Sequence, residues 1–338
     1  MMPTARLKDV AAIAGVSIKT VSNVVHDRPC VRPATRDRVR AAIAELGYRP
    51  NASARRLVTG RTGMIALALP EINVPYFAEL SRHLADLAAA RGYRVLFEQT
   101  ITGVDVERTV VSGVEAGLVD GVLYHPVALT TREVAELRQH LPFVLVGEGA
   151  APLGMDHVMI DNVAAARDAV RHLLRLGRTR IAFLGHETRS PTNTTRRRLM
   201  GYQLALEENG IAPDSDLVLA IDSFGPDEGQ RVISGAIEGG MDFDGLLCRD
   251  DILAFGAMSA LHAHGVRIPD DVAVVGWDDI AVSAYTEPTL TTISPDKHEI
   301  ATLALDMLIE RIEGHHGPGR HRLASYRLRV RASAPDDH

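Results

Sequence analysis

The side chains best suited to a specific chemistry are the basic ones near the N-terminus, where ten arginines and two lysines occur within the first 62 residues. Only four acidic residues accompany them, a net charge of +8, whereas the remaining chain has 25 basic and 39 acidic residues, a net charge of −14. This asymmetry is typical of a nucleic-acid-binding head joined to a body that does not bind nucleic acid. Charge alone does not decide the matter, because short N-terminal segments are also basic by chance.

Residue patterns that support catalysis or cofactor binding are absent from the sequence. It contains no G-x-G-x-x-G after a predicted strand, no phosphate-binding P-loop, no H-E-x-x-H and no G-x-S-x-G. His315, His316 and His321 cluster near 317–319, but their spacing suits a solvated turn better than a metal site. We therefore expect no enzyme activity, no cofactor and no metal ion.

Length and composition exclude several other classes of protein. With 338 residues, of which 46% are apolar and 24% charged, the chain is expected to fold as two or three globular domains. Apolar runs such as Met64–Leu69 are too short to span a bilayer, and the N-terminus has no apolar signal segment. The two cysteines, Cys30 and Cys248, fit a reducing compartment. We expect a cytoplasmic protein rather than a secreted, membrane or fibrous one.

Three short helices are predicted in the basic segment. The first covers Leu7–Ala14 and is broken at Gly15, after which Ser17 stands at the N-cap position of the second helix, Ile18–Val25. The third covers about 33–46. A tight glycine-containing turn between the first two helices predicts a helix-turn-helix, whose second helix enters the major groove of DNA with its first residues at the base edges.

The rest of the chain alternates apolar strands with amphipathic helices. The strands are almost continuous apolar runs, as in parallel sheets that helices cover on both faces. This order predicts an α/β class with two doubly wound subdomains, which bind ligands at the carboxyl ends of their strands, in the cleft between the halves. Strands are expected at about 64–69, 93–98, 120–124, 143–146, 157–160, 180–184, 217–221, 243–247 and 271–276.

Four runs in the N-terminal segment form one pattern when taken together. They are LKDVA at 7–11, AGVSIKTVS at 14–22, ELGYRPN at 45–51 and ARRL at 54–57. Together they resemble the head of lactose-repressor (LacI/GalR) family transcription regulators, a dense match over about fifty residues. The resemblance implies a DNA-binding domain at 1–50, followed by a hinge helix and linker at 51–62.

The resemblance also implies which residues contact DNA. Ile18, Lys19 and Asn23 fall at base-reading positions, where lysine can donate to guanine and asparagine both donates and accepts. Phosphate contacts are expected from Thr20, Ser22 and His26, and Ser17, at the N-cap, is also expected to lie at the DNA. Arg32 departs from the family's Ser or Thr at a helix cap, which implies either a weaker cap or a phosphate contact. The alternative for all of them is a solvated helix face.

The segment 51–58 is too short and polar to be a stable helix alone. In the family it folds only on the operator, where two hinges enter the minor groove side by side. The resemblance places Leu57 as the wedge at the central base step, with Ala54 against the groove floor and Asn51 and Arg55 beside them. The alternative is an ordinary linker whose leucine docks on the body.

The body carries further matching runs, NVPYF at 73–77, RLMGY at 198–202, CRDD at 248–251, PDDVAVVGWDD at 269–279 and LTTI at 290–293. They resemble the family's effector core, which is itself similar to periplasmic sugar-binding proteins. The family's chain crosses between the two halves three times, here expected near 162, 292 and 324. The resemblance thus implies an effector-binding core at 63–338, with an N-subdomain at about 63–162 and 293–324 and a C-subdomain at about 163–292 and 325–338.

By the same resemblance a small set of residues lines the effector pocket, with Arg198 and Asp278 as the pair that binds two vicinal hydroxyls through charge-assisted hydrogen bonds. The alternatives are that Arg198 is a solvated charge and that the aromatic residues are packing. Asp250 stands where the family often has Asn, and Asp251 is expected to be a helix N-cap. The expected pocket residues are Tyr76, Phe77, His125, Arg198, Phe224, Asp250 and Asp278.

These expectations combine into one functional hypothesis. The chain is expected to be a homodimeric, nucleoid-associated repressor that binds a palindromic operator in double-stranded DNA. A small sugar-like effector is expected to release it from the operator. Alternatives are a regulator activated by a nucleobase or nucleoside corepressor, a solute-binding protein of a transporter, and an α/β enzyme with a basic arm. The last two leave the +8 segment unexplained. The C-terminus carries no leucine heptad, so a tetramer-forming tail is not expected.

Overall fold

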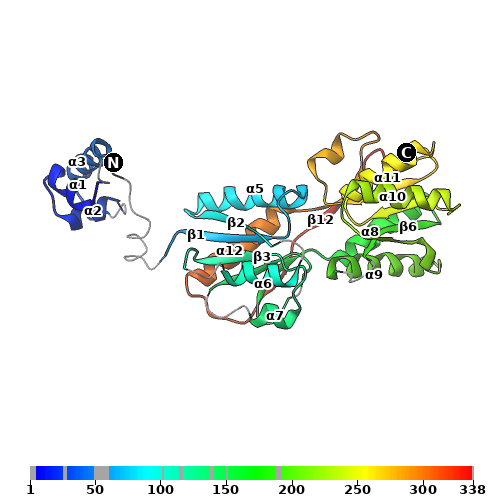
Figure 1. The fold of residues 1–338 in the computed structure, drawn as a ribbon, viewed down its shortest axis with the longest axis horizontal. Coiled ribbons are helices and arrows are strands. Elements are labelled where there is room, and N and C mark those ends of the chain that lie inside the picture. The colour runs from blue at the N-terminus through cyan, green and yellow to red at the C-terminus, as the bar shows by residue number, and fades with distance from the viewer. Residues whose placement is uncertain are drawn as a thin grey trace. The chain divides into compact units, whose positions relative to one another are not determined.

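The computed structural model describes residues 5–25, 29–48, 61–100, 103–113, 117–136, 141–149, 151–187 and 192–336. The chain divides into two units, Met1–Thr62 and Gly63–His338, here called the head and the body (Figure 1). The predicted α/β body and helical head are confirmed.

The head contains helices α1 (Leu7–Ala14), α2 (Ile18–Val25) and α3 (Pro33–Glu45), which pack around the fully buried Val10, Val21 and Val39. Helix α1 ends at Gly15, whose φ of +61° is a left-handed conformation that glycine adopts without strain. The predicted N-cap of α2 is confirmed, because Ser17 Oγ accepts a hydrogen bond from the Thr20 N–H at 3.1 Å. Three helices with this turn form a helix-turn-helix.

The body contains two six-stranded sheets. In the first, here called the N-subdomain sheet, all neighbouring strands are parallel. Its spatial order is β11 (His321–Leu323), β5 (Asp156–Met159), β4 (Phe143–Val146), β3 (Gly121–Tyr124), β1 (Met64–Leu69) and β2 (Arg94–Gln99). The helices of the N-subdomain are α5 (Pro75–Ala90), α6 (Val104–Gly113), α7 (Thr131–Glu136) and α12 (Lys297–Ile312).

The second sheet defines the C-subdomain. Its strands are parallel except β12, which runs antiparallel to β10. The spatial order is β12 (Tyr326–Arg329), β10 (Thr291–Pro295), β9 (Ala273–Trp277), β8 (Gly245–Cys248), β6 (Ile181–Glu187) and β7 (Val218–Ile221). The helices are α8 (Asn162–Arg175), α9 (Asn193–Glu208), α10 (Pro226–Glu238) and α11 (Asp251–Ala263), with short 3₁₀ turns η1 (Ser215–Leu217) and η2 (Ala281–Ala284).

Apolar residues on both sides of each central strand explain why both sheets are covered on two faces. In β1, Ile65 and Leu67 contribute to the core beneath α5 and α12, while Ala66 and Ala68 face the cluster formed with α6 and α7. In the C-subdomain, α8 and α9 cover one face of the sheet and α10 and α11 the other (Figure 1). This architecture places the carboxyl ends of the parallel strands where ligands bind in such folds.

The chain crosses between the subdomains three times, namely between β5 and α8, between β10 and α12, and between β11 and β12. The second crossing differs from the expectation. Strand β10 pairs with β12 through Pro295, so the boundary expected at 293 lies inside a strand of the C-subdomain. No strand was expected at this position, because LTTI is a short run that ends in the polar pair Ser294-Pro295.

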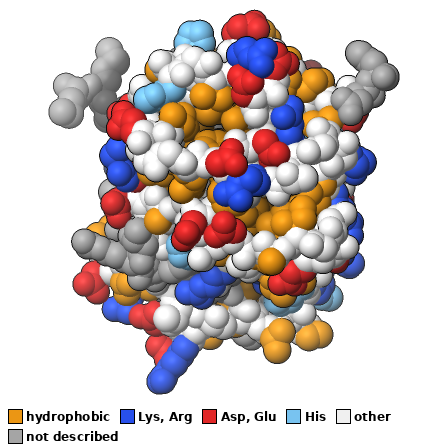
Figure 2. Space-filling view, turned by 90° about the vertical axis from the view of Figure 1, so that its right-hand side faces the viewer, with side chains coloured by type: hydrophobic (Ala, Val, Ile, Leu, Met, Phe, Trp, Pro, Cys, Tyr) orange, Lys and Arg blue, Asp and Glu red, His pale blue; other side chains and the backbone are white. Residues whose placement is uncertain are grey.

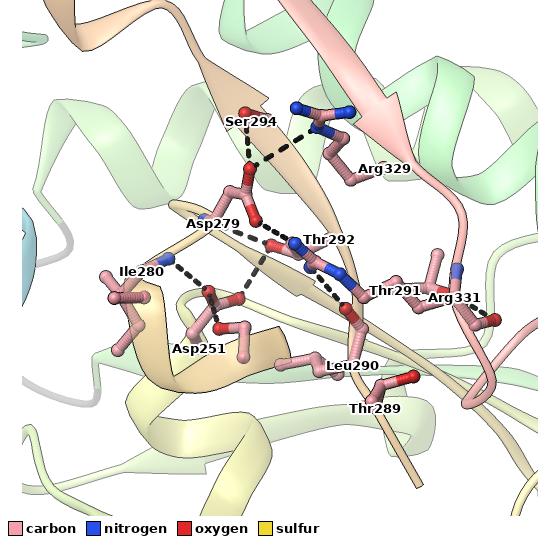
Figure 3. A network of polar contacts seen from close by, with 12 residues as sticks. Asp251, Asp279, Ile280, Thr289, Leu290, Thr291, Thr292, Ser294, Arg329 and Arg331 are labelled. Carbon is pink, nitrogen blue, oxygen red and sulfur yellow. Dashed lines mark hydrogen bonds and ion pairs between the residues drawn. The ribbon is translucent and has the colours of Figure 1, made fainter. Parts of the chain in front are cut away.

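A buried carboxylate organises the interior of the C-subdomain (Figure 3). Asp251, the first residue of α11, is 1% exposed and accepts hydrogen bonds from Ser283 Oγ at 2.6 Å, Thr292 Oγ1 at 2.6 Å and the Ile280 N–H at 3.0 Å. Gly276 leaves room for it, since a Cβ there would lie 2.3 Å from Asp251 Oδ1. The network joins α11, η2 and β10, so it fixes the loop between β9 and β10 to the sheet.

A second carboxylate lies beside this network in the same loop. Asp279 accepts hydrogen bonds from Ser294 Oγ at 2.8 Å and from Arg331 Nη2 at 2.6 Å, and Arg329 Nε lies 3.6 Å from its carboxylate (Figure 3). Since Ser294 belongs to β10 and Arg329 to β12, the loop is attached to both crossing strands of the C-subdomain.

The end of the body formed by the C-subdomain shows acidic and basic side chains side by side, with apolar side chains between them (Figure 2). No field of a single sign dominates this face. A surface of this kind attracts phosphates far less than the basic head does.

Candidate DNA interface and effector site

Helix α2 presents a distinct outer face. Val21 and Val24 are buried in the head, whereas Ile18 is 53% exposed and Lys19 is also exposed. Residues four apart lie on the same helix face, so Asn23 continues the line of Lys19. The structure therefore brings Ile18, Lys19 and Asn23 to the outside, where a recognition helix meets base edges.

A shallow groove of about 440 Å³ lies beside this face, between α2 and α3. Ser17, Thr20 and Asn23 line it together with Arg32 and other residues of the α3 side. Arg32 occupies the N-cap of α3 without a capping hydrogen bond from its side chain. Sequence reasoning missed two further polar residues of the same groove, Thr35 and Arg38.

Ser22 is half-buried on α2, on the same side as Ile18. The other expected DNA contacts, His26, Asn51, Ala54, Arg55 and Leu57, lie outside the described residues.

The expected effector residues of the N-subdomain form an aromatic group. Tyr76 and Phe77, in the first turn of α5, contact each other edge to face with centroids 5.4 Å apart, and Phe77 contacts the His125 ring at 5.0 Å. His125 follows β3, and burial lowers its pKa to about 4, so the imidazole is neutral at pH 7. Its Nδ1 is buried with no hydrogen-bond partner among the described residues.

The centre of the C-subdomain side is Arg198 on α9. This guanidinium is 8% exposed, lies 3.9 Å above the ring of Trp277, donates from Nε to Asn162 Oδ1 at 2.8 Å and donates to the Arg249 carbonyl. Burial lowers the pKa of Arg198 to about 10, which still leaves it charged at pH 7. Arg198 is thus a fixed, desolvated cation rather than a solvated surface charge.

Two carboxyl groups, the buried Glu148 and the half-buried Asp278, share the field of this arginine. Burial raises the pKa of Asp278 to about 8 and that of Glu148 to about 7, and Arg198 opposes both shifts only in part. Glu148 Oε1 accepts a weak hydrogen bond from the Ile160 N–H at 3.4 Å, while Oε2 has no partner among the described residues. Both groups therefore titrate near neutral pH and retain acceptor capacity for a ligand.

The two subdomains meet at these residues. The pKa of Tyr76 is raised, first by burial and then by the charges of Asp278 and Glu148. An electrostatic effect of this kind requires the α5 aromatics, the end of β4 and the end of β9 to be close together. Asp278 also has a φ of +110°, a strained conformation for a non-glycine residue that costs about 1–3 kcal/mol and is typical of functional sites.

Arg249 is a second cation at the site. It donates to Asp250 Oδ2 at 2.8 Å and to Thr195 Oγ1 at 3.1 Å, and its guanidinium carbon lies 4.4 Å above the ring of Phe224. Phe224 is 50% exposed, so its outer face is open to a ligand rather than packed in the core. Glu187 Oε1 lies 3.6 Å from Arg249 Nε.

One sequence expectation about the acidic pair was wrong. Asp250, not Asp251, is the N-cap of α11, because Asp250 Oδ1 accepts from the Leu253 N–H at 2.8 Å. Asp251 is instead the centre of the buried network. The shift of one residue follows from β8 ending at Cys248, which leaves Arg249 and Asp250 to make the turn into the helix. The Asp250 carboxylate is consequently occupied by the cap and by Arg249.

Sequence reasoning also missed several side chains of the site, Glu148, Asn162, Arg249 and Trp277. For Glu148 a usable signal existed, since it follows a predicted apolar strand by two residues, as Asp278 follows the strand at 271–276. Asn162, Arg249 and Trp277 support Arg198 through contacts that only the packed structure reveals.

Among the residues that the structure describes, no group of three or more His, Cys, Asp or Glu side chains is placed to hold a metal ion. None of the described helices is long and apolar enough to cross a membrane.

Comparison with known proteins decides the family. Residues 6–51 match the family described as bacterial regulatory proteins, lacI family, and residues 170–334 match the periplasmic binding protein-like domain. The chain is 34% identical over 306 residues to the HTH-type transcriptional regulator RegA of Clostridium saccharobutylicum, covering 90% of this chain and 91% of that protein. The chain belongs to the lacI family of bacterial regulatory proteins.

Solved structures of lacI-family proteins share the same architecture. A structure of the lac repressor dimer bound to operator and the anti-inducer ONPF matches with a TM-score of 0.88 at 26% identity, covering 99% of this chain and 100% of that chain. A complex of the regulator CelR with cellobiose matches with a TM-score of 0.71 at 31% identity, covering 97% of this chain and 99% of that one. This chain is therefore a transcription regulator with a DNA-binding helix-turn-helix and a periplasmic-binding-protein-like body.

Proposed function

We propose that this lacI-family regulator is a homodimeric repressor, acting in the cytoplasm, that binds a palindromic operator and leaves it when a small sugar-like effector binds to the body. One observation carries the proposal. Two carboxyl groups, the buried Glu148 and the half-buried Asp278, converge with the fixed guanidinium of Arg198 where the two subdomains meet, and Glu148 Oε2 has no hydrogen-bond partner among the described residues. This set of acceptors and donors suits a molecule with several hydroxyl groups.

The proposed contacts follow from the chemistry of each group. Asp278 and Glu148 accept hydrogen bonds from effector hydroxyls, and Arg198 donates to the hydroxyl or ring oxygens between them. Tyr76 and Phe77, together with the exposed ring of Phe224, cover the apolar face of a pyranose ring. His125 adds a neutral imidazole nitrogen, whereas Asp250 contributes through Arg249. Cellobiose, the ligand named in the complex of CelR, is of this chemical class.

On the DNA side, Lys19 and Asn23 are proposed to read base edges and Ile18 to contact a thymine methyl group. Ser17, Thr20, Ser22 and His26 are proposed to contact phosphates, and Asn51, Ala54, Arg55 and Leu57 to enter the minor groove. The lac repressor named above is a dimer on its operator. Two heads related by a two-fold axis would read a palindrome in the same way.

The coupling between the two sites is proposed to be a shift between two arrangements of the subdomains. Only one of them presents the two hinge segments of a dimer to adjacent positions on the operator. An effector that binds the other arrangement more tightly lowers operator affinity by the ratio of its two affinities. The effector therefore acts as an inducer.

Selection from random duplex DNA by the purified protein at near-physiological salt tests this proposal. Enrichment of a palindrome is expected, as is loss of the selected DNA when the correct sugar is added. Failure to enrich any sequence without ligand, followed by enrichment on adding a nucleoside, would replace the inducer with a corepressor. No enrichment under any condition would refute sequence-specific binding.

The contact residues are tested on the selected site. Lys19→Ala is expected to relax preference at one symmetric pair of base positions by about 1–3 kcal/mol, whereas a phosphate contact would weaken binding to all sequences equally. Lys8→Ala is the matched control, because Lys8 is an exposed lysine on α1 rather than on α2. A steep dependence of operator affinity on salt is expected for the wild-type protein.

A further inference from the structure

The distribution of lysine in the chain is unusual. Lys+Arg total 37, yet only three are lysines, and two of these, Lys8 and Lys19, lie in the head. The body therefore contains a single lysine, Lys297, which is 9% exposed. A compact ammonium with three donors can satisfy partners that a planar guanidinium fork cannot reach together. The contacts around Lys297 show such a set of partners.

Lys297 and Glu79 form an ion pair that holds the C-subdomain at two points. The pair itself belongs to the N-subdomain, because Glu79 lies on α5 and Lys297 begins α12, and its Nζ–Oε2 distance is 2.9 Å. Lys297 Nζ donates to the carbonyl of Asp279 at 2.9 Å, while Glu79 Oε1 accepts from the N–H of Ala281 at 2.8 Å. Cation and carboxylate thus bind one carbonyl and one N–H of the loop between β9 and η2.

This loop carries the proposed effector contact. Asp278, with its φ of +110°, directly precedes Asp279, whose φ is +48° and whose carboxylate is held by Ser294 and Arg331. On the other side, Tyr76 lies one turn before Glu79 on α5, and its ring centre is 6.0 Å from Lys297 Nζ. Displacement of the loop from the ion pair would therefore displace Asp278 relative to the α5 aromatics.

The surroundings of the pair allow such a displacement. A pocket of about 320 Å³ opens beside it, lined by Glu79, Lys297, the rings of His83 and His298, and the crossing segments around Ser294 and Tyr326. Release of the loop at this point breaks two hydrogen bonds, those of the Asp279 carbonyl and the Ala281 N–H.

We propose that the Glu79–Lys297 pair, through its hydrogen bonds to the Asp279 carbonyl and the Ala281 N–H, is the contact that determines how readily the two subdomains separate. We call this contact the fastening. We also propose that Lys297 is a positioning residue for Asp278. The second part rests on the function proposed above, in which Asp278 binds the effector. The first part does not, since it concerns only the two arrangements of the body.

Amine acylation of the full-length protein, followed by mass spectrometry of the lysine peptides, tests the fastening. Lys297 is expected to react far more slowly than the exposed Lys8 and Lys19, which serve as references within the same chain. Glu79→Gln removes the carboxylate and is expected to raise the acylation rate of Lys297 about tenfold or more, because the loop opens more often. Asp86→Asn, which removes an exposed carboxylate from the same helix, should leave the rate unchanged.

Distance measurements separate opening of the body from a local change at the lysine. Nitroxide labels at Ala89 on α5 and Gln230 on α10, both exposed, report the distance between the subdomains in a Cys30→Ser background. Glu79→Gln and Lys297→Met are each expected to broaden the distribution toward a second distance. Lys297→Arg should not restore the wild-type distribution, whereas Asp86→Asn should retain it.

Wild-type distance distributions in both pair variants, together with a wild-type acylation rate of Lys297 in Glu79→Gln, would overturn the proposal. Neither readout requires DNA or effector, so a failed operator selection with altered distances would refute the proposed function while leaving the fastening in place. The positioning role has its own readout, because Lys297→Met should weaken the binding of an identified effector about tenfold, whereas Asp86→Asn should not.

Discussion

Two aspartates of the C-subdomain, the buried Asp251 and the half-buried Asp278, differ in a way that separates structure from function. Burial raises the pKa of both, to about 7 for Asp251 and about 8 for Asp278. Asp251 accepts three hydrogen bonds of 3.0 Å or less from Ile280, Ser283 and Thr292. The carboxyl group of Asp278 lies in the field of Arg198, which directs its own hydrogen bonds to Asn162 and Arg249.

The difference teaches how to interpret a desolvated carboxylate. A buried acceptor whose partners all come from the same chain stabilises the fold, since each partner would be left unsatisfied without it. A half-buried carboxyl group on a backbone with a φ of +110° costs stability, and the proposed function accounts for it by a ligand that donates hydrogen bonds to it. The same contrast applies to Glu148, whose Oε2 has no partner among the described residues.

The largest effect is expected from Asp251→Ala. Removal of the carboxylate leaves three buried donors without an acceptor and is expected to lower the free energy of unfolding by about 4 kcal/mol. Urea denaturation followed by circular dichroism measures the change. Asp278→Ala is the control and should lose much less stability. Equal losses in the two variants would contradict the distinction drawn between the aspartates.

Arg198→Ala is expected to act on ligand binding. Loss of the central donor should weaken the effector about 100-fold, or about 3 kcal/mol, while the affinity of the ligand-free protein for operator remains unchanged. Isothermal titration with the effector and an operator-binding assay measure the two quantities. Retention of the effector response in this variant would remove Arg198 from the site.

Ser283→Ala tests the network with a smaller loss of stability, because it removes only one of the three donors to Asp251. The Ser283 Oγ–Asp251 Oδ2 distance is 2.6 Å. The expected loss is about 2 kcal/mol in the free energy of unfolding, with effector affinity unchanged. Thermal or urea denaturation gives the first value and a ligand titration the second. A change in effector affinity without loss of stability would assign the network to the site.

The smallest effect is expected from pH. In the free protein the pKa of Asp278 is about 8, above the value near 3.9 in an unfolded chain, so the folded state retains the proton and loses stability as pH rises between these values. Effector hydroxyls favour the ionised carboxylate, but a protonated carboxyl group still accepts a hydrogen bond through its carbonyl oxygen. Effector affinity should therefore rise by less than about tenfold in total from pH 6 to pH 8 and then level off. Glu148, with a pKa of about 7, contributes in the same direction.

The control for pH is Asp278→Asn combined with Glu148→Gln, which removes both titrating groups and should flatten the profile. Affinity that falls with rising pH in the wild-type protein would mean that the effector needs the protonated carboxyl groups as donors.

Much of the architecture could be predicted from the sequence, because it depends on local patterns. The Gly15 turn and the Ser17 cap predicted the helix-turn-helix, and continuous apolar runs such as 271–276 predicted doubly covered strands. The same rule fails at strand ends. Strand β10 was not expected, because its short run ends in the polar Ser294-Pro295, and the choice between Asp250 and Asp251 as the cap depended on where β8 ends.

Individual residues of the site were predictable only where the residue type and the family pattern together indicated their chemistry. Arg198 and Asp278 could be named as candidate ligand contacts from the family pattern, but the stacking of Arg198 on Trp277 and its hydrogen bond to Asn162 come from packing between distant segments. The role of the Glu79–Lys297 pair depends on two backbone groups, the Asp279 carbonyl that Lys297 binds and the Ala281 N–H that Glu79 binds, which no side-chain pattern reveals.

Operator affinity, measured with and without a ligand known to occupy the site, tests most directly whether the body controls the head. Trp277 is the chain's only tryptophan and lies beneath Arg198, so its fluorescence reports occupancy while a panel of sugars and nucleosides is screened. We predict that a ligand that changes this fluorescence lowers the affinity for the selected palindrome about tenfold or more at constant salt. Unchanged operator affinity with the site filled would contradict the proposal that this regulator responds to an effector.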